Sequence, residues 1–261
     1  MIRLIIDTYH MGSWNMACDL AIAKHVGKKV QPTTIRLYSW NLATLSIGRF
    51  QKIEDIDIDY LKKKYIDLVR RPTGGRAVLH HKEITYLFAA NIDHPKLPKS
   101  VVGSYKVIAE ALIKSMEELG IKCDMEKNKN NHNNTPACYD APSIYEITVD
   151  KKKFIGSAQY RNESYVLQHG SIPQIFPLRD YVNLFKMPED KKEKLYKHLE
   201  KRVIDINTLI GRTVDCEEMA NAFKKGFEDV FEEEVVLGEL SPSEIELTKK
   251  LVDKFEINLD D

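Results

Sequence analysis

The sequence predicts an α+β fold, in which strands and helices share the first part of the chain and helices follow alone. Three patterns support this prediction. Runs rich in β-branched and aromatic residues, such as residues 83–90, indicate buried strands. Residues 101–119 place apolar side chains at helical spacing and end at Gly120. From Arg179 onward the pattern is helical, and no internal repeat is present.

The individual elements follow from hydrophobic periodicity and turn residues. Ser13 is expected to cap the first helix, and Ser241 with Pro242 marks the start of the last. The expected strands are residues 1–7, 33–40, 42–50, 83–90, 144–149, 154–161 and 165–172. The expected helices are residues 14–25, 58–66, 101–119, 181–185, 191–202, 216–231 and 243–254. The chain length of 261 fits one large domain over residues 1–210, with a C-terminal helical extension over residues 211–261 packed on it.

The composition suits a soluble globular protein. It is 43% hydrophobic and 30% charged, and 39 lysines and arginines balance 39 acidic residues. A nucleic-acid binder usually has a basic excess, so no nucleic-acid partner is expected. No apolar run approaches the length that crosses a bilayer, so no membrane partner is expected. Residues 1–7 form too brief an apolar run for a signal peptide, which leads us to expect a cytoplasmic protein.

The four cysteines form no C-x-x-C pair and have no zinc-ligand spacing with a histidine, so no metal site is expected. In the cytoplasm they are expected to be reduced thiols. Cys138 differs from the others because it lies between Pro136 and Pro142, just after an asparagine-rich stretch at residues 127–134. A thiol on a loop close to cations can react, although an ordinary half-buried cysteine fits the same pattern.

Residues 70–81, Arg-Arg-Pro-Thr-Gly-Gly-Arg-Ala-Val-Leu-His-His, combine cationic, flexible and titratable groups. Gly74 and Gly75 precede an apolar run, where glycine serves mainly a turn or a closely approaching ligand. Two readings are open at this point: the floor of a binding site, or a hairpin turn with a basic rim.

A second candidate segment begins at Lys153. The small residues Gly156, Ser157 and Ala158 would leave a groove in their strand for a backbone or a ligand. The period of two places Lys153 on the face of Ile155 and Ser157, at the lip of that groove. A lysine there can donate to a developing oxyanion. Residues 168–171 are expected to line the same groove from the next strand.

These segments resemble known motifs. Residues 70–80 are similar to one signature of the biotin/lipoate protein ligase superfamily, and residues 153–159, Lys-Phe-Ile-Gly-Ser-Ala-Gln, to its second. Residues 137–143, Ala-Cys-Tyr-Asp-Ala-Pro-Ser, and residues 167–172, Leu-Gln-His-Gly-Ser-Ile, resemble the cysteine-dependent protein octanoyltransferases of Gram-positive bacteria. The match covers nearly the whole chain. It implies the catalytic fold of that superfamily, a mixed β-sheet flanked by helices, over residues 1–210.

The resemblance also implies a reaction in lipoate biosynthesis. The donor would be octanoyl-acyl carrier protein, whose thioester the Cys138 thiolate attacks to give an acyl-enzyme. The acceptor would be the lysine of a lipoyl domain, such as that of the glycine-cleavage H protein. Neither ATP nor another cofactor is needed, because an amide forms from a thioester downhill. Lys153 would serve as oxyanion donor or proton shuttle and would help to hold Cys138 as a thiolate.

Further site residues follow from the same resemblance, as substrate-binding groups rather than catalytic ones. They are Arg71, Gly74, Gly75, His80, Gly156, Ser157, Ala158 and His169. The glycines and small residues would let an acyl chain lie close to backbone.

Three other functions compete with this interpretation. ATP-dependent lipoate ligases of the superfamily usually carry a third glycine and an aspartate where this chain has Arg76 and His81, and they generally lack the cysteine. An amidotransferase that moves octanoyl groups between lipoyl domains would share the nucleophile and differ in the donor. A non-catalytic module that binds lipoyl or carrier domains is the alternative outside enzymes.

Overall fold

A mixed β-sheet forms the centre of the computed structural model, which describes residues 1–127 and 145–259. Its strands within these residues, in spatial order, are β11 (Val235–Leu237), β1 (Ile2–His10), β2 (Thr34–Trp40), β6 (Glu83–Asn91), β10 (Tyr165–Pro173), β9 (Lys152–Arg161), β8 (Tyr145–Val149) and β7 (Asp124–Lys127). The first three run parallel, and each later neighbour is antiparallel. The expected mixed sheet flanked by helices is therefore confirmed.

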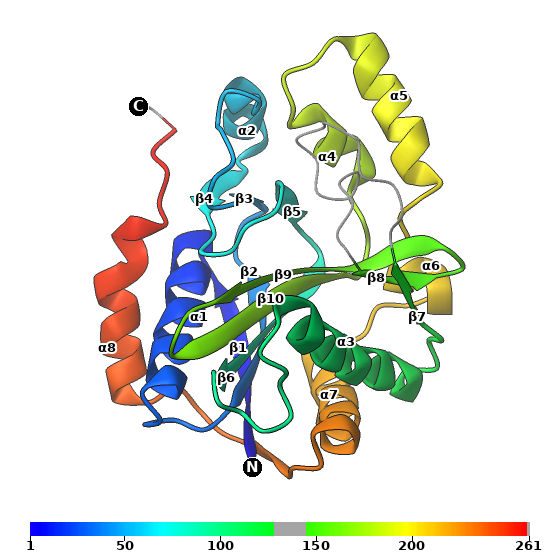
Figure 1. Ribbon diagram of the computed structural model, residues 1–261. Coiled ribbons are helices and arrows are strands. Elements are labelled where there is room, and N and C mark those ends of the chain that lie inside the picture. The colour runs from blue at the N-terminus through cyan, green and yellow to red at the C-terminus, as the bar shows by residue number, and fades with distance from the viewer. Residues whose placement is uncertain (128–144, 260–261) are drawn as a thin grey trace.

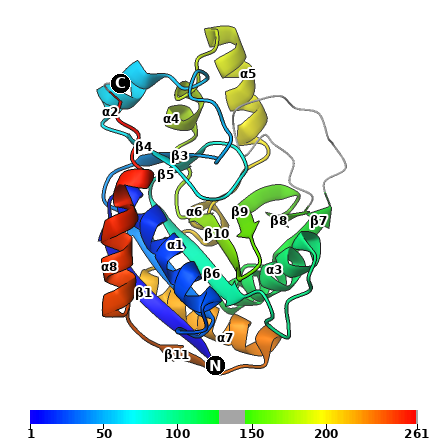
Figure 2. The ribbon, with the colours of Figure 1, turned by 60° about the vertical axis from the view of Figure 1, so that its left-hand side comes forward.

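Helices cover both faces of this sheet, as Figures 1 and 2 show. They are α1 (Gly12–Gly27) and α8 (Pro242–Leu251) on one face, and α3 (Val101–Glu118) and α7 (Cys216–Phe231) on the other. Between the sheet and α7, the aromatic rings of Phe88, Phe223, Phe227 and Phe231 stack on one another. This face is apolar, and its burial supplies much of the hydrophobic stabilisation of the fold.

A second, three-stranded sheet lies above the α1 face, at the top of Figure 1. Its strands are β4 (Asp67–Arg70), β3 (Thr44–Ile47) and β5 (Val78–His80), and the helices beside it are α2 (Ile58–Lys64), α4 (Leu178–Asn183) and α5 (Glu189–Glu200). A separate cluster of buried apolar residues holds this layer together. The remaining helices are α6 (Ile206–Ile210) and a 3₁₀ turn at Val252–Lys254.

The structure differs from the expectations at several places, since β4, β7 and α6 were not expected as elements, and two further differences have a clear physical reason. Helix α1 begins after Met11 without a side-chain cap, and Ser13 instead donates to Glu256 at 3.2 Å. The Asp67 carboxylate of β4 accepts from the Gly12 N–H, so a residue distant in sequence caps this helix. Strand β11 was not expected within the helical C-terminal part. It has three residues, too few to show a period of two, and it pairs with β1 at the sheet edge.

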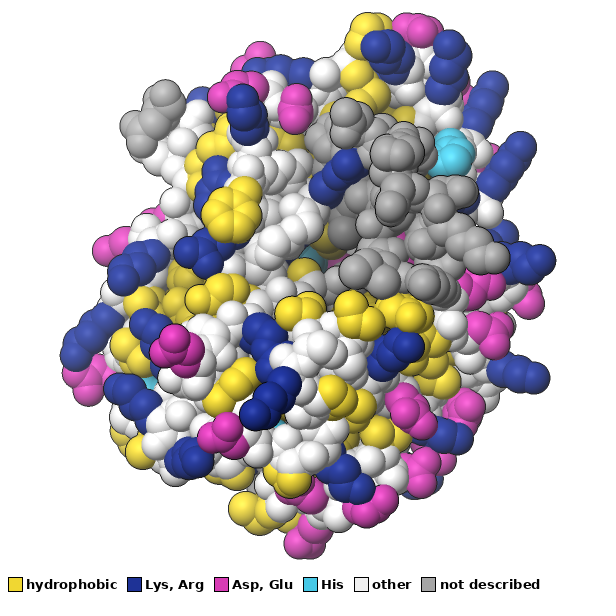
Figure 3. Space-filling view, viewed as in Figure 1, with side chains coloured by type: hydrophobic (Ala, Val, Ile, Leu, Met, Phe, Trp, Pro, Cys, Tyr) yellow, Lys and Arg dark blue, Asp and Glu magenta, His cyan; other side chains and the backbone are white. Residues whose placement is uncertain are grey.

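The surface carries both signs of charge. Figure 3 shows lysine and arginine side chains interspersed with aspartate and glutamate over one face of the molecule. In the described part of the chain, no helix combines the length and the apolar composition required to span a membrane.

Candidate functional site

The loop at residues 71–76 lies between the two sheets, and Arg71 holds it from within. Nε of Arg71 donates to the Gly74 carbonyl at 3.2 Å, and Nη2 donates to the carbonyls of Gly74 and Arg76 at 2.8 and 2.7 Å. Nη1 donates to the carbonyl and hydroxyl oxygens of Ser46 at 2.9 and 3.2 Å. All five guanidinium N–H groups of Arg71 therefore point at protein acceptors, and this buried side chain shapes the loop.

His80 is the centre of the first of two chains of hydrogen bonds that end near this loop, which we call the histidine chains. Its Nδ1 lies 2.7 Å from Oε1 of Glu83, and its Nε2 lies 2.7 Å from the hydroxyl of Ser46. Trp40 stacks on the imidazole with 4.0 Å between ring centroids. An ionised Glu83 can only accept, and Thr85 and Ser171 also donate to it. The proton of His80 thus belongs on Nδ1, and Nε2 accepts from Ser46.

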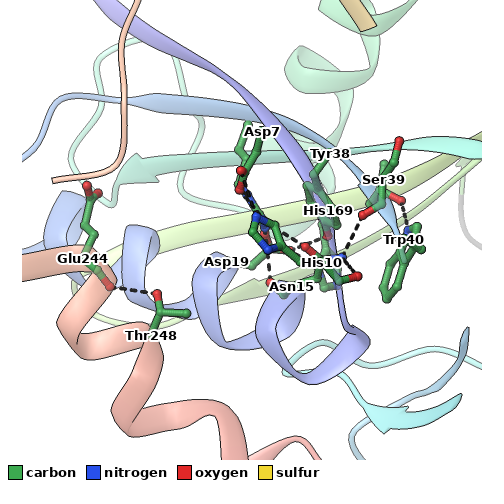
Figure 4. Close-up of polar contacts among 12 residues, drawn as sticks. Asp7, His10, Asn15, Asp19, Tyr38, Ser39, Trp40, His169, Glu244 and Thr248 are labelled. Carbon is green, nitrogen blue, oxygen red and sulfur yellow. Dashed lines mark hydrogen bonds and ion pairs between the residues drawn. The ribbon is translucent and has the colours of Figure 1, made fainter. Parts of the chain in front are cut away.

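His169 forms the second chain, from α1 through β10 to the loop. Its Nδ1 lies 2.9 Å from Oδ2 of Asp19, and its Nε2 lies 2.7 Å from the hydroxyl of Thr73. Figure 4 shows Asp19 between His169 and Tyr38, whose hydroxyl donates to the same carboxylate at 2.8 Å. Arg36 donates to the other Asp19 oxygen at 2.9 Å. Burial lowers the pKa of His169 although Asp19 opposes it, so the neutral ring donates to Asp19 and accepts from Thr73.

The backbone of this loop has room for a neighbour on its outer side. Among residues 1–127 and 145–259, no atom would lie within 4 Å of a Cβ at Gly74, and Gly75 is exposed with φ of +90°, which favours glycine. On the inner side, a Cβ at Gly48 would come within 1.9 Å of the Gly75 carbonyl oxygen. The loop thus packs closely against the end of β3, whereas Gly74 has no such close neighbour in the described part of the chain.

Lys153 lies on the face of the large sheet that points toward the small sheet, and not on the face of Ile155 and Ser157 as the period of two predicts. In the pairing of β8 with β9, Ile147 faces Ile155 but Thr148 faces Lys153, which makes Phe154 an extra residue. This β-bulge reverses the direction of the lysine side chain. The Lys153 ammonium lies 3.0 Å from Oε1 of Glu146, and both side chains are buried.

The predicted substrate-binding residues of β9 divide between the two faces of the sheet. Gly156 pairs with Ser171 and Ala158 pairs with His169, so both face the small sheet together with Lys153. Ser157 pairs with Gly170 and accepts from the hydroxyl of Tyr86 at 2.8 Å, on the side of α3 and α7. The structure therefore gathers every predicted site residue in its described part except Ser157 at one interface between the sheets.

The predicted nucleophile, Cys138, lies outside the described residues, as does the whole stretch from 128 to 144. Burial raises the pKa of Cys18 and of Cys123 to about 12, and it also raises the pKa of Cys216. These three thiols are poor sources of thiolate. Within residues 1–127 and 145–259, no cluster of His, Cys, Asp and Glu side chains could hold a metal ion.

Three carboxylates of this region were not identified from the sequence: Asp19, Glu83 and Glu146. Of the three, Asp19 could most easily have been predicted, since it falls among buried residues of a helix whose apolar spacing was recognised. A carboxylate is rarely fully buried unless it is paired, so its position alone indicated a partner. Glu146 gave no such signal, because its partner depends on the bulge.

Comparison with known proteins adds an independent line of observation. Residues 12–228 match the family model of the lipoyl protein ligase A/B catalytic domain. The octanoyltransferase LipM of Geobacillus kaustophilus is 41% identical over 235 residues, covering 87% of this chain and 84% of that protein. LipM of Clostridioides difficile is 40% identical over 261 residues, covering 97% and 95%.

Two solved structures have a similar fold over almost the whole chain. The bi-partite lipoate protein ligase of Thermoplasma acidophilum gives a TM-score of 0.77 at 24% identity and covers 97% of this chain and 92% of that one. A lipoate-protein ligase A bound with ATP gives 0.78 at 23% identity, covering 97% and 94%. At these identities the likeness establishes a common fold and leaves the reaction to other observations.

Proposed function

Because the chain belongs to the family of the lipoyl protein ligase A/B catalytic domain, we propose that it is an octanoyltransferase of lipoate biosynthesis that carries its acyl group on Cys138. The family and the fold agree with the superfamily resemblance of the motifs. The observation that carries the proposal is the likeness to octanoyltransferases over nearly the whole chain.

The first step takes the octanoyl group from octanoyl-acyl carrier protein. The Cys138 thiolate attacks the thioester carbonyl, a new carbon–sulfur bond forms, and the bond to the carrier thiol breaks. The carrier leaves as a thiolate that takes up a proton. The raised pKa values of the other three thiols support Cys138 as the sulfur that reacts.

The second step passes the octanoyl group to the lysine of a lipoyl domain, for which we propose the glycine-cleavage H protein. The lysine reacts as its neutral amine: the nitrogen attacks the acyl-enzyme carbonyl, the bond to the Cys138 sulfur breaks, and the proton that the nitrogen gives up passes to the departing Cys138 thiolate. In both steps a negative charge develops on the carbonyl oxygen. The Lys153 ammonium, on the face toward the small sheet, is the group we assign to stabilise it.

The acyl chain has a suitable wall on the same face. Gly156 and Ala158 present almost no side chain there, and both are only half-buried. Gly74 is next to Thr73, which binds the His169 that pairs with Ala158, and no described atom would lie within 4 Å of a Cβ at Gly74. We assign a supporting role to His80, His169 and Arg71, because their side chains hydrogen-bond to other protein groups and so hold this wall in place.

ATP-dependent ligases of the superfamily usually carry a glycine and an aspartate where this chain has Arg76 and His81. Arg71, the buried cation of the 71–76 loop, points its guanidinium donors at backbone and Ser46. This disfavours the ATP-dependent ligase, which remains the second candidate because of the fold it shares. The octanoyl amidotransferase differs only in its donor, and the experiment below separates it.

The test is to incubate the purified protein with octanoyl-acyl carrier protein and measure its mass. We expect a gain of one octanoyl group, mapped to Cys138 and removed by hydroxylamine, and no gain in Cys138→Ala. Transfer of free octanoate that requires ATP, without an adduct, would favour the ligase. Loading by an octanoylated lipoyl domain but not by the carrier protein would favour the amidotransferase. We also propose a cytoplasmic location, where a reduced thiol is maintained.

A further inference from the structure

Glu146 has no role in the reaction described so far, yet it lies beside the lysine that the reaction needs. It is on β8, two residues before Thr148, and Lys153 faces Thr148 across the strand pair. The side chains of Glu146 and Lys153 therefore share one face. Their charged atoms are 3.0 Å apart, with 8% and 6% of the respective side chains exposed.

The backbone of Lys153 is fixed on both sides. One neighbour is β8, and on the other side the Lys153 N–H donates to the Arg202 carbonyl at 2.6 Å and its own carbonyl accepts from Ile204 N–H at 3.1 Å. The bulge at Phe154 then determines the face on which the side chain emerges. With the root of the lysine held in this way, its flexible stem leaves the position of the ammonium to groups such as Glu146.

The charge of the ammonium needs support as much as its position does. Removing an ammonium from water favours the neutral amine, and a carboxylate within about 4 Å favours the charged form instead. An amine donates weakly to a developing oxyanion, whereas an ammonium forms a charge-assisted hydrogen bond. A buried oxyanion donor in this position thus depends on a carboxylate partner.

We propose that Glu146 is a positioning residue of the acyl transfer: its carboxylate keeps the Lys153 ammonium charged and aimed at the substrate carbonyl oxygen. The identity of the substrate in this proposal rests on the proposed function, whereas the ion pair between Glu146 and Lys153 is observed in the structure. Because the same ammonium serves the attack by Cys138 and the attack by the acceptor lysine, loss of Glu146 slows both steps. A Glu146 that served as proton acceptor for the incoming lysine would affect the second step alone.

The experiment compares Glu146→Gln and Glu146→Asp with a matched control, Thr148→Val. Gln keeps the shape of the side chain and removes its charge, and Asp shortens the side chain and keeps the charge. Thr148 is on the same face and 2% exposed, and in the described part of the chain its hydroxyl meets no hydrogen-bond partner. Its replacement by Val keeps the branched shape and should leave both rates unchanged.

The rates are those of adduct formation from octanoyl-acyl carrier protein and of transfer to a lipoyl domain, per folded molecule. We expect Glu146→Gln to slow both at least about tenfold, and Glu146→Asp to lose less. In a Lys153→Met background, Glu146→Gln should cause no further loss. If Glu146→Gln keeps both rates near those of the wild type while Glu146→Asp is slow, the shape of the side chain matters and not its charge, and the proposal is overturned. Slowing of the second step alone in Glu146→Gln would also overturn it.

The charge state of Lys153 can also be measured by NMR, without any assay of activity, and this measurement tests the proposal by itself. In protein labelled with ¹³C at lysine, the Cε resonance of Lys153 is assigned by its loss in Lys153→Met. We expect the shift of an ammonium at pH 8 in the wild type and in Thr148→Val, and a shift toward that of an amine in Glu146→Gln. An ammonium retained in Glu146→Gln would overturn the proposal. A wild type that forms no octanoyl adduct would refute the proposed function instead, and this readout would still apply.

Discussion

Two of the buried ion pairs in the described part of the chain differ in their cation and in the elements that they join. Arg3 and Glu244 tie β1 to α8, and Lys153 and Glu146 tie β9 to β8. Arg3 donates twice to Glu244, at 2.6 and 3.0 Å, and its other N–H groups bind Thr34 and the Glu239 carbonyl. Lys153 instead carries a compact ammonium on a flexible stem.

If the proposed function holds, burial serves structure in the first pair and chemistry in the second. The planar fork of Arg3 is matched at each donor and held in a single geometry, which suits a joint between elements. An ammonium can rotate its donors, and so it can turn toward an oxygen that exists only during a reaction. The following predictions test this contrast, in order of decreasing effect.

The largest effect is expected from Lys153→Met, which removes the ammonium and keeps an apolar stem. The rate of octanoyl transfer should fall about a hundredfold or more, since the oxyanion loses its charged donor. Stability should also fall, because Glu146 is left as an uncompensated buried charge. Adding Glu146→Gln should recover the stability measured by denaturant unfolding and leave the rate low. Recovery of both would mean that Lys153 acts only through the fold.

Arg3→Met should produce the opposite result. It leaves Glu244 buried without its partner, at a cost of about 3 to 5 kcal/mol in the free energy of unfolding, with an unchanged rate per folded molecule. Burial opposes ionisation of Glu244, but Arg3 and Ser241 outweigh it and lower its pKa below the ordinary 4.5. A lowered carboxyl pKa stabilises the fold above the unfolded value, and this contribution disappears as the pH falls through the folded value.

The destabilisation by Arg3→Met should therefore shrink below about pH 4.5. Chemical denaturation of the wild type and the variant from pH 7 to pH 3 measures it. A difference that is constant over this range would indicate that Arg3 acts by packing rather than by charge.

A smaller effect is expected from Thr73→Val, which leaves Nε2 of His169 without its 2.7 Å partner. One buried unpaired acceptor costs about 1 to 3 kcal/mol. Because the 71–76 loop loses one attachment, KM for the acyl donor should rise more than kcat falls. Thr73→Ser, which keeps the hydroxyl, is the control, and an equal rise in KM there would mean that the loop responds to any change of shape at this position rather than to loss of the hydrogen bond.

The smallest effect is expected from Lys151→Ala, two residues before the proposed catalytic lysine. Lys151 is exposed in the β8–β9 turn with φ of 64°, so its charge is solvated. Both rate and stability should stay near wild type, apart from a small cost because Ala tolerates a positive φ poorly. A large loss of transfer in an assay at physiological ionic strength would contradict the choice of Lys153 among the three neighbouring lysines.

Much of the fold could be predicted from the sequence because its longer elements are strongly periodic. Helix α7 has the predicted bounds, and α3 differs by one residue. Strand β11 could not be recognised, since a short edge strand is defined by its partner β1 and not by its own pattern. The trans cap from Asp67 likewise depends on a contact between distant parts of the chain.

The site divides in the same way. The motifs predicted Lys153, His80 and His169 as site residues, because each motif lies within one segment, and the structure places all three at the interface between the sheets. They could not give the face of Lys153, since one inserted residue in a strand pair changes that face without altering the apparent alternation. Its partner Glu146 was missed for the same reason.

The two histidine chains have a mechanical consequence. They pin the 71–76 loop at Thr73 and, through Ser46, at Arg71, so side-chain hydrogen bonds help to fasten the small sheet to the large one. A single residue inserted between Arg71 and Thr73 would therefore pull one anchor from its histidine. A residue inserted between Gly74 and Arg76 would displace one of the two carbonyls that Arg71 binds. The spacing from Arg71 to Arg76 is thus fixed by side chains at both of its ends.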